Sequence, residues 1–155
     1  MMKTLKDIDA SILPWLGRAS KGIDYFIADC FQARGIKLTK VQMILLKRLV
    51  DNDGQPQHNL ASITNRDKTS LARLLSTMEK KGMVRREMCE QDRRINHVFI
   101  TPIGINVLNE AVPIIHEIIE TIQKEISESE LKTTIKVLKK LAKNIQPREE
   151  SPELN

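Results

Sequence analysis

Apolar residues recur at three- and four-residue steps along much of the chain, which is the spacing of one face of an α-helix. The first such stripe begins at Ile8 and continues to Cys30, so it predicts a helix from Ile8 to about Ala33. Pro14 lies in the first turns of this helix, where proline is tolerated, and we expect the regular part to begin near it. Gly35 follows as a typical helix stop.

Three further helices are predicted before the pattern changes. Thr39 and Gln42 have the spacing of a capping box, in which each side chain bonds the other's free backbone N–H. Asp67 is a favourable N-cap, and Gly82 suits the position that follows a helix end. The predicted helices run from Thr39 to a turn at residues 51–54, over residues 57–64, and from Lys68 to Lys81.

The period then changes to the alternation that is typical of β-strands. Residues 84–88 and 96–100 alternate, and the charged turn 89–95 lies between them. We therefore predict a two-stranded hairpin with a basic tip. Thr101 and Pro102 follow as an N-cap and a first-position proline, a combination that favours the start of a helix.

The C-terminal part is predicted to be helical. A long apolar stretch runs from Ile103 to Ile126, and we expect Pro113 to kink or divide it. Ser127 and Glu130 form a second capping box, which begins a last amphipathic helix. The tail 147–155 is rich in proline and glutamate and is expected to be disordered.

Charge is concentrated in the middle of the 155 residues. Residues 34–101 carry 14 basic and 7 acidic side chains, residues 1–33 carry 4 of each, and residues 102–155 carry 7 basic and 9 acidic ones. A central basic module is typical of a nucleic-acid-binding protein, although a solvated basic surface without a partner gives the same count. The sequence shows no apolar run of a signal peptide or of a membrane span, so we expect a cytoplasmic, nucleoid-associated protein without a membrane partner.

The helix from Lys68 to Lys81 has two unlike faces. Its apolar side carries leucines and a methionine. The side chains on its other side are short or basic, as close approach to base edges requires. Arg73 could pair with a guanine, and Thr69 and Ala72 could contact a thymine methyl group. An ordinary amphipathic surface helix would share this pattern. The candidate DNA-reading residues are Lys68, Thr69, Ser70, Ala72, Arg73 and Ser76.

The predicted hairpin strengthens the DNA-binding interpretation. Arginines gather on it, and a basic tip can enter a minor groove, where arginine responds to narrow width and negative potential. Asp92 could orient one guanidinium toward DNA, or it could simply hold the hairpin together through Arg94. The candidate wing residues are Arg85, Arg86, Asp92, Arg93 and Arg94.

These segments together resemble the MarR family of bacterial transcription regulators. The resemblance rests on Leu38-Thr39-Lys40-Val41-Gln42, Leu60-Ala61, residues 67–75, Glu79-Lys80-Lys81-Gly82 with Met83-Val84-Arg85-Arg86, Asp92-Arg93-Arg94 and Thr101-Pro102-Ile103-Gly104. It implies a mainly α fold, namely a winged helix-turn-helix with a three-helix core, a two-stranded β-wing and long terminal dimerisation helices. Residues 1–37 and 102–146 would form the homodimer, and residues 38–101 would bind DNA.

The resemblance also implies a function. A homodimer would bind a pseudo-palindromic operator as a repressor, with Arg94 nearest the minor groove and Asp92 holding the wing. A small, often aromatic, anion would release the DNA. The sequence departs from the family where Arg66 replaces an apolar residue, which favours a phosphate contact beside Thr39 and Lys40. Ala72 replaces a more usual polar residue, and Pro113 is unusual in its helix.

Other functions are weighed against the same residues. Cys89 near the arginines could serve a redox-responsive regulator, whereas Cys30 on the first apolar stripe is expected to be structural. A winged-helix module that binds a protein instead of DNA is a further alternative. The three histidines, His58, His97 and His116, lack metal-ligand spacing, and no catalytic motif is present, so we predict no enzyme, metal or cofactor.

Overall fold

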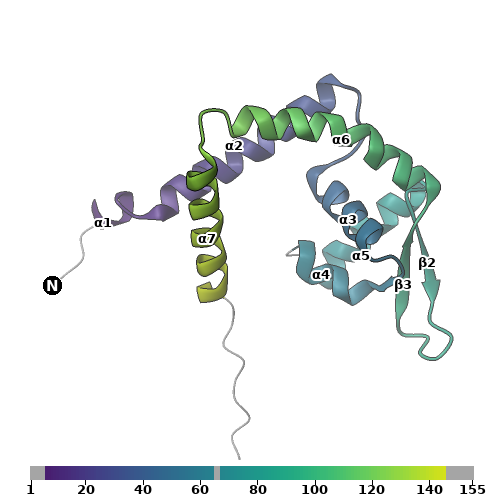
Figure 1. Cartoon of the computed structure of the whole chain (residues 1–155). Helices are drawn as coiled ribbons and strands as arrows, with labels where there is room; N and C mark the ends of the chain where they lie inside the picture. Colours follow the sequence, from purple (N-terminus) through teal and green to yellow (C-terminus); the bar gives the residue numbers. More distant parts are fainter. Residues whose placement is uncertain (1–5, 65–66, 146–155) are drawn as a thin grey trace, which may run out of the picture. The chain divides into compact units, whose positions relative to one another are not determined.

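The structure, a computed structural model, describes residues 6–64 and 67–145 and divides into two compact units, with the boundary after Ile119. The predicted disordered tail, residues 147–155, lies outside the described residues. The first unit holds α1 (Lys6–Asp9), α2 (Ile12–Ala33), α3 (Lys40–Asp51), β1 (Gln55–Pro56), α4 (Gln57–Thr64), α5 (Lys68–Lys80), β2 (Val84–Met88), β3 (Asn96–Ile100) and most of α6 (Pro102–Ile122). The second holds the end of α6 and α7 (Glu128–Ile145). The fold is mainly helical and carries a β-hairpin in the position of the wing, which confirms the predicted fold class (Figure 1).

The N-terminal helix is interrupted where one continuous helix was predicted. The Ser11 hydroxyl donates to the carbonyl oxygen of Ile8 at 2.6 Å and accepts the N–H of Leu13 at 3.3 Å. A serine that bonds local backbone groups in this way ends one helix and caps the next. Pro14 is the third residue of α2, where no intrahelical hydrogen bond is lost.

The starts of the later helices were predicted accurately because they depend on local hydrogen bonds. Thr39 and Gln42 form the expected capping box of α3, with distances of 3.1 and 3.2 Å. Ser127 and Glu130 form the second, at the start of α7. In contrast, α6 runs through Pro113 without being divided. Burial of α6 residues on both sides of the proline, including Ala111 and Ile114, holds the helix together across the missing bond.

The sheet has three antiparallel strands in the order β1-β3-β2, one more than the predicted hairpin. β2 and β3 have the predicted bounds, and their register pairs Val84 with Ile100 and Met88 with Asn96. β1 adds only Gln55 and Pro56 to the other edge of β3. A two-residue strand that contains proline has no alternation to detect, so the sequence pattern could not reveal it.

One hydrophobic core joins the helices of the first unit to the sheet. It takes side chains from α2, α3, α4, α5, both long strands and α6. Its largest fully buried side chains are Phe31, Leu45, Leu46, Leu49, Leu60, Leu71, Leu75, Met78, Val84 and Val98. The tip of the β2–β3 hairpin extends beyond the helices of this unit (Figure 1). No helix in the described part of the chain is both long and apolar enough to cross a lipid bilayer.

The start of α6 is locked to the turn between α5 and β2. Thr101 donates its backbone N–H to the carbonyl oxygen of Met83 at 3.1 Å and its hydroxyl to that of Gly82. The same hydroxyl accepts the N–H of Gly104 at 3.1 Å, so it caps the helix. Gly104 lies so close to Met83 that a Cβ atom there would collide with the Met83 backbone carbonyl.

We therefore expect Gly104→Ala to destabilise the protein although alanine is the better helix former. The collision with a backbone atom should cost about 1–3 kcal/mol in free energy of unfolding. Chemical denaturation at a fixed protein concentration measures this cost. Gly22→Ala, also within a helix but with no atom of the protomer within 4 Å of the added Cβ, is the matched control and should not lower stability. Equal stability of the two variants would contradict the close approach.

Candidate nucleic-acid interface

The N-terminus of α5 is fixed by its predicted cap. Asp67 accepts the backbone N–H of Ser70 at 2.8 Å and the Ser70 hydroxyl at 3.1 Å. These hydrogen bonds lower the pKa of Asp67 below its ordinary value, so the cap is charged at neutral pH. Ser70, predicted to face DNA, is half-buried and serves this cap. The negative cap stabilises the helix end through the helix dipole.

The two faces of α5 are separated as the sequence predicts. Leu71, Leu75 and Met78 are buried, which leaves the opposite side free of the core. Lys68, Thr69 and Arg73 are exposed on that side, whereas Ala72 is half-buried. The structure thus brings these predicted residues together along one helix.

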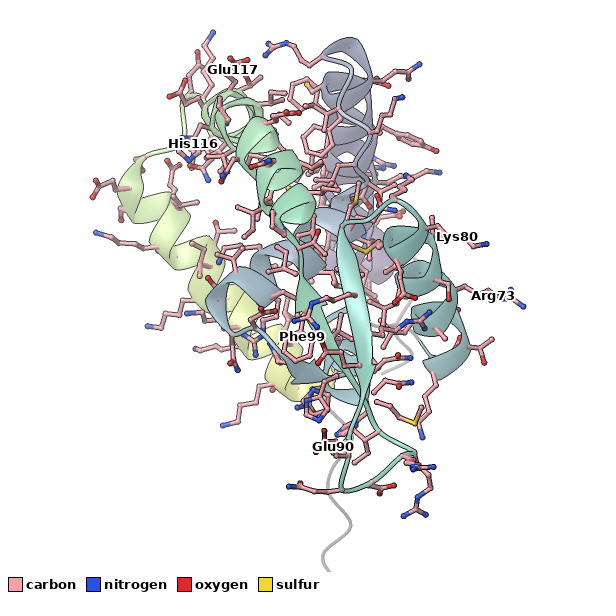
Figure 2. The ribbon with its side chains drawn as sticks, turned by 90° about the vertical axis from the view of Figure 1, so that its right-hand side faces the viewer. Arg73, Lys80, Glu90, Phe99, His116 and Glu117 are labelled. Atoms are coloured by element: carbon pink, nitrogen blue, oxygen red, sulfur yellow. The ribbon has the colours of Figure 1, made fainter. Side chains whose placement is uncertain are left out.

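Thr77 and Lys80 extend this face beyond the predicted set. Both are exposed, and Arg73 and Lys80 extend from the same side of α5 in Figure 2. The Thr77 hydroxyl donates to the carbonyl oxygen of Arg73 at 3.0 Å. Their spacing of four and seven residues from Arg73 is the signal that could have identified them from the sequence.

The C-terminal end of α5 is tied to the wing through Arg86. Glu79 accepts the backbone N–H of Arg86 at 3.0 Å, Nε at 3.1 Å and Nη2 at 2.7 Å. Nη2 also donates to Ser76 Oγ at 3.1 Å. The bonds from Arg86 hold the pKa of Glu79 below the ordinary value of a glutamate. Arg86 therefore binds both Glu79 and Ser76, and both Arg86 and Ser76 are predicted DNA contacts.

Arg85 lies on the other side of β2 and is also held by the protein. Its guanidinium carbon stands 4.4 Å from the centre of the Phe99 ring, which is a cation–π contact, and it forms an ion pair with Glu87. Strand alternation explains why neighbouring arginines have different partners, because successive side chains point to opposite faces.

The wing loop presents the remaining two arginines to solvent. Asp92 accepts the backbone N–H of Arg94 at 3.0 Å and its Nε at 3.1 Å, which lowers the pKa of Asp92. The Arg94 side chain is nevertheless 90% exposed. Arg93 is exposed beside it. Nη2 of Arg94 also donates to Asp92 Oδ2 at 3.2 Å, so Asp92 binds one edge of the guanidinium and leaves its other edge accessible.

A hollow of about 730 Å³ separates the start of α5 from the wing. It is lined by Gln57, His58, Lys68, Leu71, Asp92, Arg94, Ile95 and Asn96. Its two cations come from the helix and from the wing, so a single anion or a strand of phosphates could contact both. Gln57 Oε1 is buried and lacks a hydrogen-bond partner among the described residues.

The candidate phosphate contacts are placed less uniformly. Thr39 is exposed but caps α3, and Lys40 forms an ion pair with Asp24 of α2. Arg66 lies outside the described residues.

The two thiols, Cys30 and Cys89, are unpaired with each other and half-buried. Within residues 6–64 and 67–145, no three metal-binding side chains form a group.

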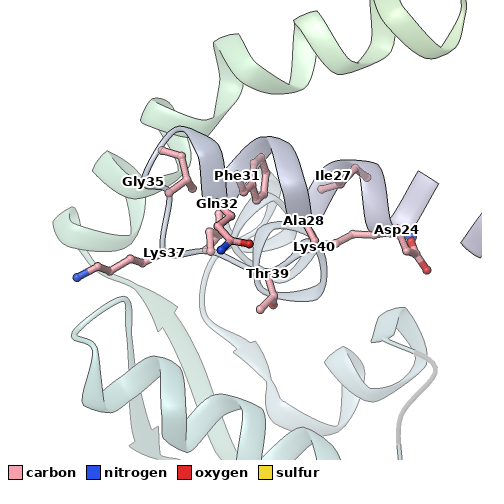
Figure 3. A pocket seen from close by; sticks show the side chains of 11 residues that line it. Asp24, Ile27, Ala28, Phe31, Gln32, Gly35, Lys37, Thr39 and Lys40 are labelled. Carbon is pink, nitrogen blue, oxygen red and sulfur yellow. The ribbon is translucent and has the colours of Figure 1, made fainter. Parts of the chain in front are cut away.

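A second cavity lies between α2 and the start of α3. Its volume is about 360 Å³, and Ile27, Phe31 and Leu38 give it an apolar lining beside Lys37 and Lys40 (Figure 3). The Lys40–Asp24 ion pair lies at its edge, so an occupant would touch the contact between these two helices.

Known proteins resemble this chain in sequence. A family model, described as MarR family, matches residues 38–95. The transcriptional regulator HosA of Escherichia coli O157:H7 is 31% identical over 104 residues, which is 67% of this chain and 77% of HosA.

Solved structures repeat the fold at lower identity. The transcriptional repressor CouR, bound to a 23-mer DNA duplex, has a TM-score of 0.80 at 18% identity, covering 92% of this chain and 99% of CouR. The PcaV transcriptional regulator from Streptomyces coelicolor, in complex with its natural ligand, has a TM-score of 0.73 at 15% identity, covering 92% and 98% of the two chains.

Proposed function

The chain belongs to the MarR family of transcriptional regulators, and we propose that it is a repressor that binds a pseudo-palindromic operator as a homodimer. The observation that carries the proposal is the pair of exposed basic elements, the outer face of α5 and the wing loop, within one compact unit. Lys68, Thr69, Ala72 and Arg73 would lie in the major groove. Arg93 and Arg94 would reach the minor groove. CouR, of the same fold, is bound to a DNA duplex.

Phosphate contacts would complete the DNA-binding surface formed by residues 38–101. Thr39 is polar and Lys80 is basic, and both are exposed, so each could contact a phosphate. Arg66 keeps its predicted role as a phosphate contact. Lys40 would have to share its charge with Asp24, so we rank it below these. Two such surfaces in a dimer, about 34 Å apart, would meet successive major grooves. The protein would act on the nucleoid in the cytoplasm.

Arg94→Ala should weaken operator binding by tenfold or more without changing the thermal unfolding temperature. The side chain is 90% exposed, so its loss removes a DNA contact and leaves the core intact. Fluorescence polarisation with DNA from the gene's own upstream region measures the affinity. Lys47→Ala, which removes one cation from the Lys47–Asp51 pair of α3, is the control and should bind almost normally.

Equal affinity of the wild-type protein for this DNA and for random duplex at moderate salt would reject the proposed function. Unchanged operator affinity of Arg94→Ala would reject only the role of that residue.

Exposed apolar side chains support the dimer. In the first unit Ile12, Leu13, Trp15 and Leu16 of α2 are exposed, with Leu13 at 68%. In the second unit, α7 is amphipathic, yet none of its residues is buried. Apolar surface of this extent is typical of an interface. The helices of residues 1–37 and 102–146 would supply it.

Leu13→Glu should convert the dimer to a monomer because it places a charge in the interface. Light scattering after gel filtration measures the mass, and operator affinity should fall with it because two half-sites can no longer be bound together. Ala33→Glu adds the same charge at the far, exposed end of α2 and should leave the dimer intact. A Leu13→Glu protein that stays dimeric would place the interface elsewhere.

A small aromatic anion is the proposed releasing ligand, and the α2–α3 cavity is its proposed site. Phe31 and Ile27 could pack against an aromatic ring, and Lys37, whose amine extends away from them in Figure 3, would turn toward the cavity to pair with a carboxylate. An occupant there would disturb the contact that positions α3 beneath the DNA-binding elements. The solved PcaV structure, in complex with its natural ligand, is consistent with ligand control in this fold.

Aromatic carboxylates should therefore release the operator from the wild-type protein, and Ala28→Trp should abolish that response by filling the cavity. Ala28 lines the cavity and is exposed, so the variant should keep its fold and its operator affinity. The readout is polarisation of labelled operator during titration. A normal response in Ala28→Trp would exclude this cavity.

A further inference from the structure

Three side chains join the recognition helix to the wing. Glu79 stands one residue before the end of α5, Ser76 lies one turn earlier, and Arg86 is the middle residue of β2. Arg86 gives three N–H groups to Glu79 and a further bond from Nη2 to Ser76 Oγ. We call these three residues the clamp.

The geometry of the clamp fixes both the position and the rotation of β2. The backbone N–H of Arg86 donates to Glu79 Oε1, so the strand itself is held at the helix end. Nε and Nη2 both donate to Oε2, and the planar guanidinium allows little rotation in such an arrangement. Arg86 also pairs with Val98 of β3, a fully buried residue, so the fixed strand carries the whole hairpin with it.

The guanidinium is also poorly placed to contact a partner. Its side chain is only 23% exposed, against 90% for Arg94. Its charge is paired with the Glu79 carboxylate, and Nε and Nη2 already donate to Glu79 and Ser76. Only the Nη1 N–H groups lie outside these bonds, and a phosphate that reached them would approach a guanidinium whose charge is already paired with the Glu79 carboxylate.

We propose that Ser76, Glu79 and Arg86 position the wing relative to α5, so that Arg86 and Ser76 act in operator binding through this position and not by contacting DNA. The inference rests on the proposed DNA-binding function. It gives Arg86 and Ser76 a different role from the direct contact predicted from the sequence. Helix and wing enter different grooves, so an error in their separation weakens both contacts together.

Glu79→Gln separates the two roles because they predict effects of opposite sign. If Arg86 contacts DNA, removing the carboxylate frees a cation and removes a negative charge near the DNA, so binding tightens. If the clamp positions the wing, a neutral amide holds Arg86 less firmly, and operator affinity falls by about threefold to tenfold, which we expect. Polarisation with operator and with random duplex measures both affinities.

Glu90→Gln is the matched control. Glu90 is exposed in the wing loop, outside the clamp (Figure 2), so this variant removes the same charge and leaves Arg86 in place. It should bind operator as tightly as the wild-type protein or slightly more tightly. Arg86→Lys supplies an independent variant: it keeps a cation that could contact phosphate but loses the fork that reaches Glu79 and Ser76. We expect its affinity to fall as for Glu79→Gln.

Hydrogen exchange of the free protein gives a readout that does not involve DNA. The amide of Arg86 should exchange faster in Glu79→Gln and in Arg86→Lys, but not in Glu90→Gln. Operator binding by Glu79→Gln that equals or exceeds that of the wild type, while Arg94→Ala is impaired, overturns the clamp alone. A wild-type protein without preference for operator overturns the DNA-binding function, and this inference with it.

Discussion

The helix α5 has to be buried on one side and bare on the other, and the first unit is organised around that constraint. Leu71, Leu75 and Met78 are at most 1% exposed, and burying side chains of this size stabilises by about 1.5–3 kcal/mol each. Turning the helix by one residue, about 100°, would bring Arg73 toward the core. The packing therefore determines which residues can meet a partner, before any partner is present.

The same constraint explains why the ends of α5 are so closely defined. Asp67 fixes its start, and at its other end Gly82 takes a positive φ of 71° that favours glycine. The N–H of Met83 then bonds the carbonyl oxygen of Met78 at 2.9 Å, which closes the helix and directs the chain into β2. Because Thr101 is bonded to this turn, the wing and the start of α6 share one anchor.

Sequence could predict these elements because their signals are local. Capping boxes, the glycine after α5 and the alternation of β2 and β3 each involve residues a few positions apart, and the bounds of α4, β2 and β3 were predicted exactly as observed. The candidate site was less accessible. Arg86 and Ser76 are ten residues apart across a turn and a change of secondary structure, and no periodic rule places one beside the other. Similarly, the contact between Arg85 and Phe99 depends on the strand register, which the sequence pattern does not give.

The net charge alone overestimates the number of cations that are available to contact DNA. The central excess of basic residues includes Lys40, Arg85 and Arg86, which are engaged by acidic or aromatic neighbours. The exposed cations that remain are Lys68, Arg73 and Lys80 on α5, Lys81 directly after it, and Arg93 and Arg94 on the wing. Arg86, which is bound within the protein, contributes little to attraction but fixes the distance between the exposed cations of α5 and those of the wing, of which Arg94 is itself paired with Asp92. Nonspecific attraction depends on the number of cations, whereas recognition of one sequence depends on where they are held, so the internal ion pairs favour specificity over affinity.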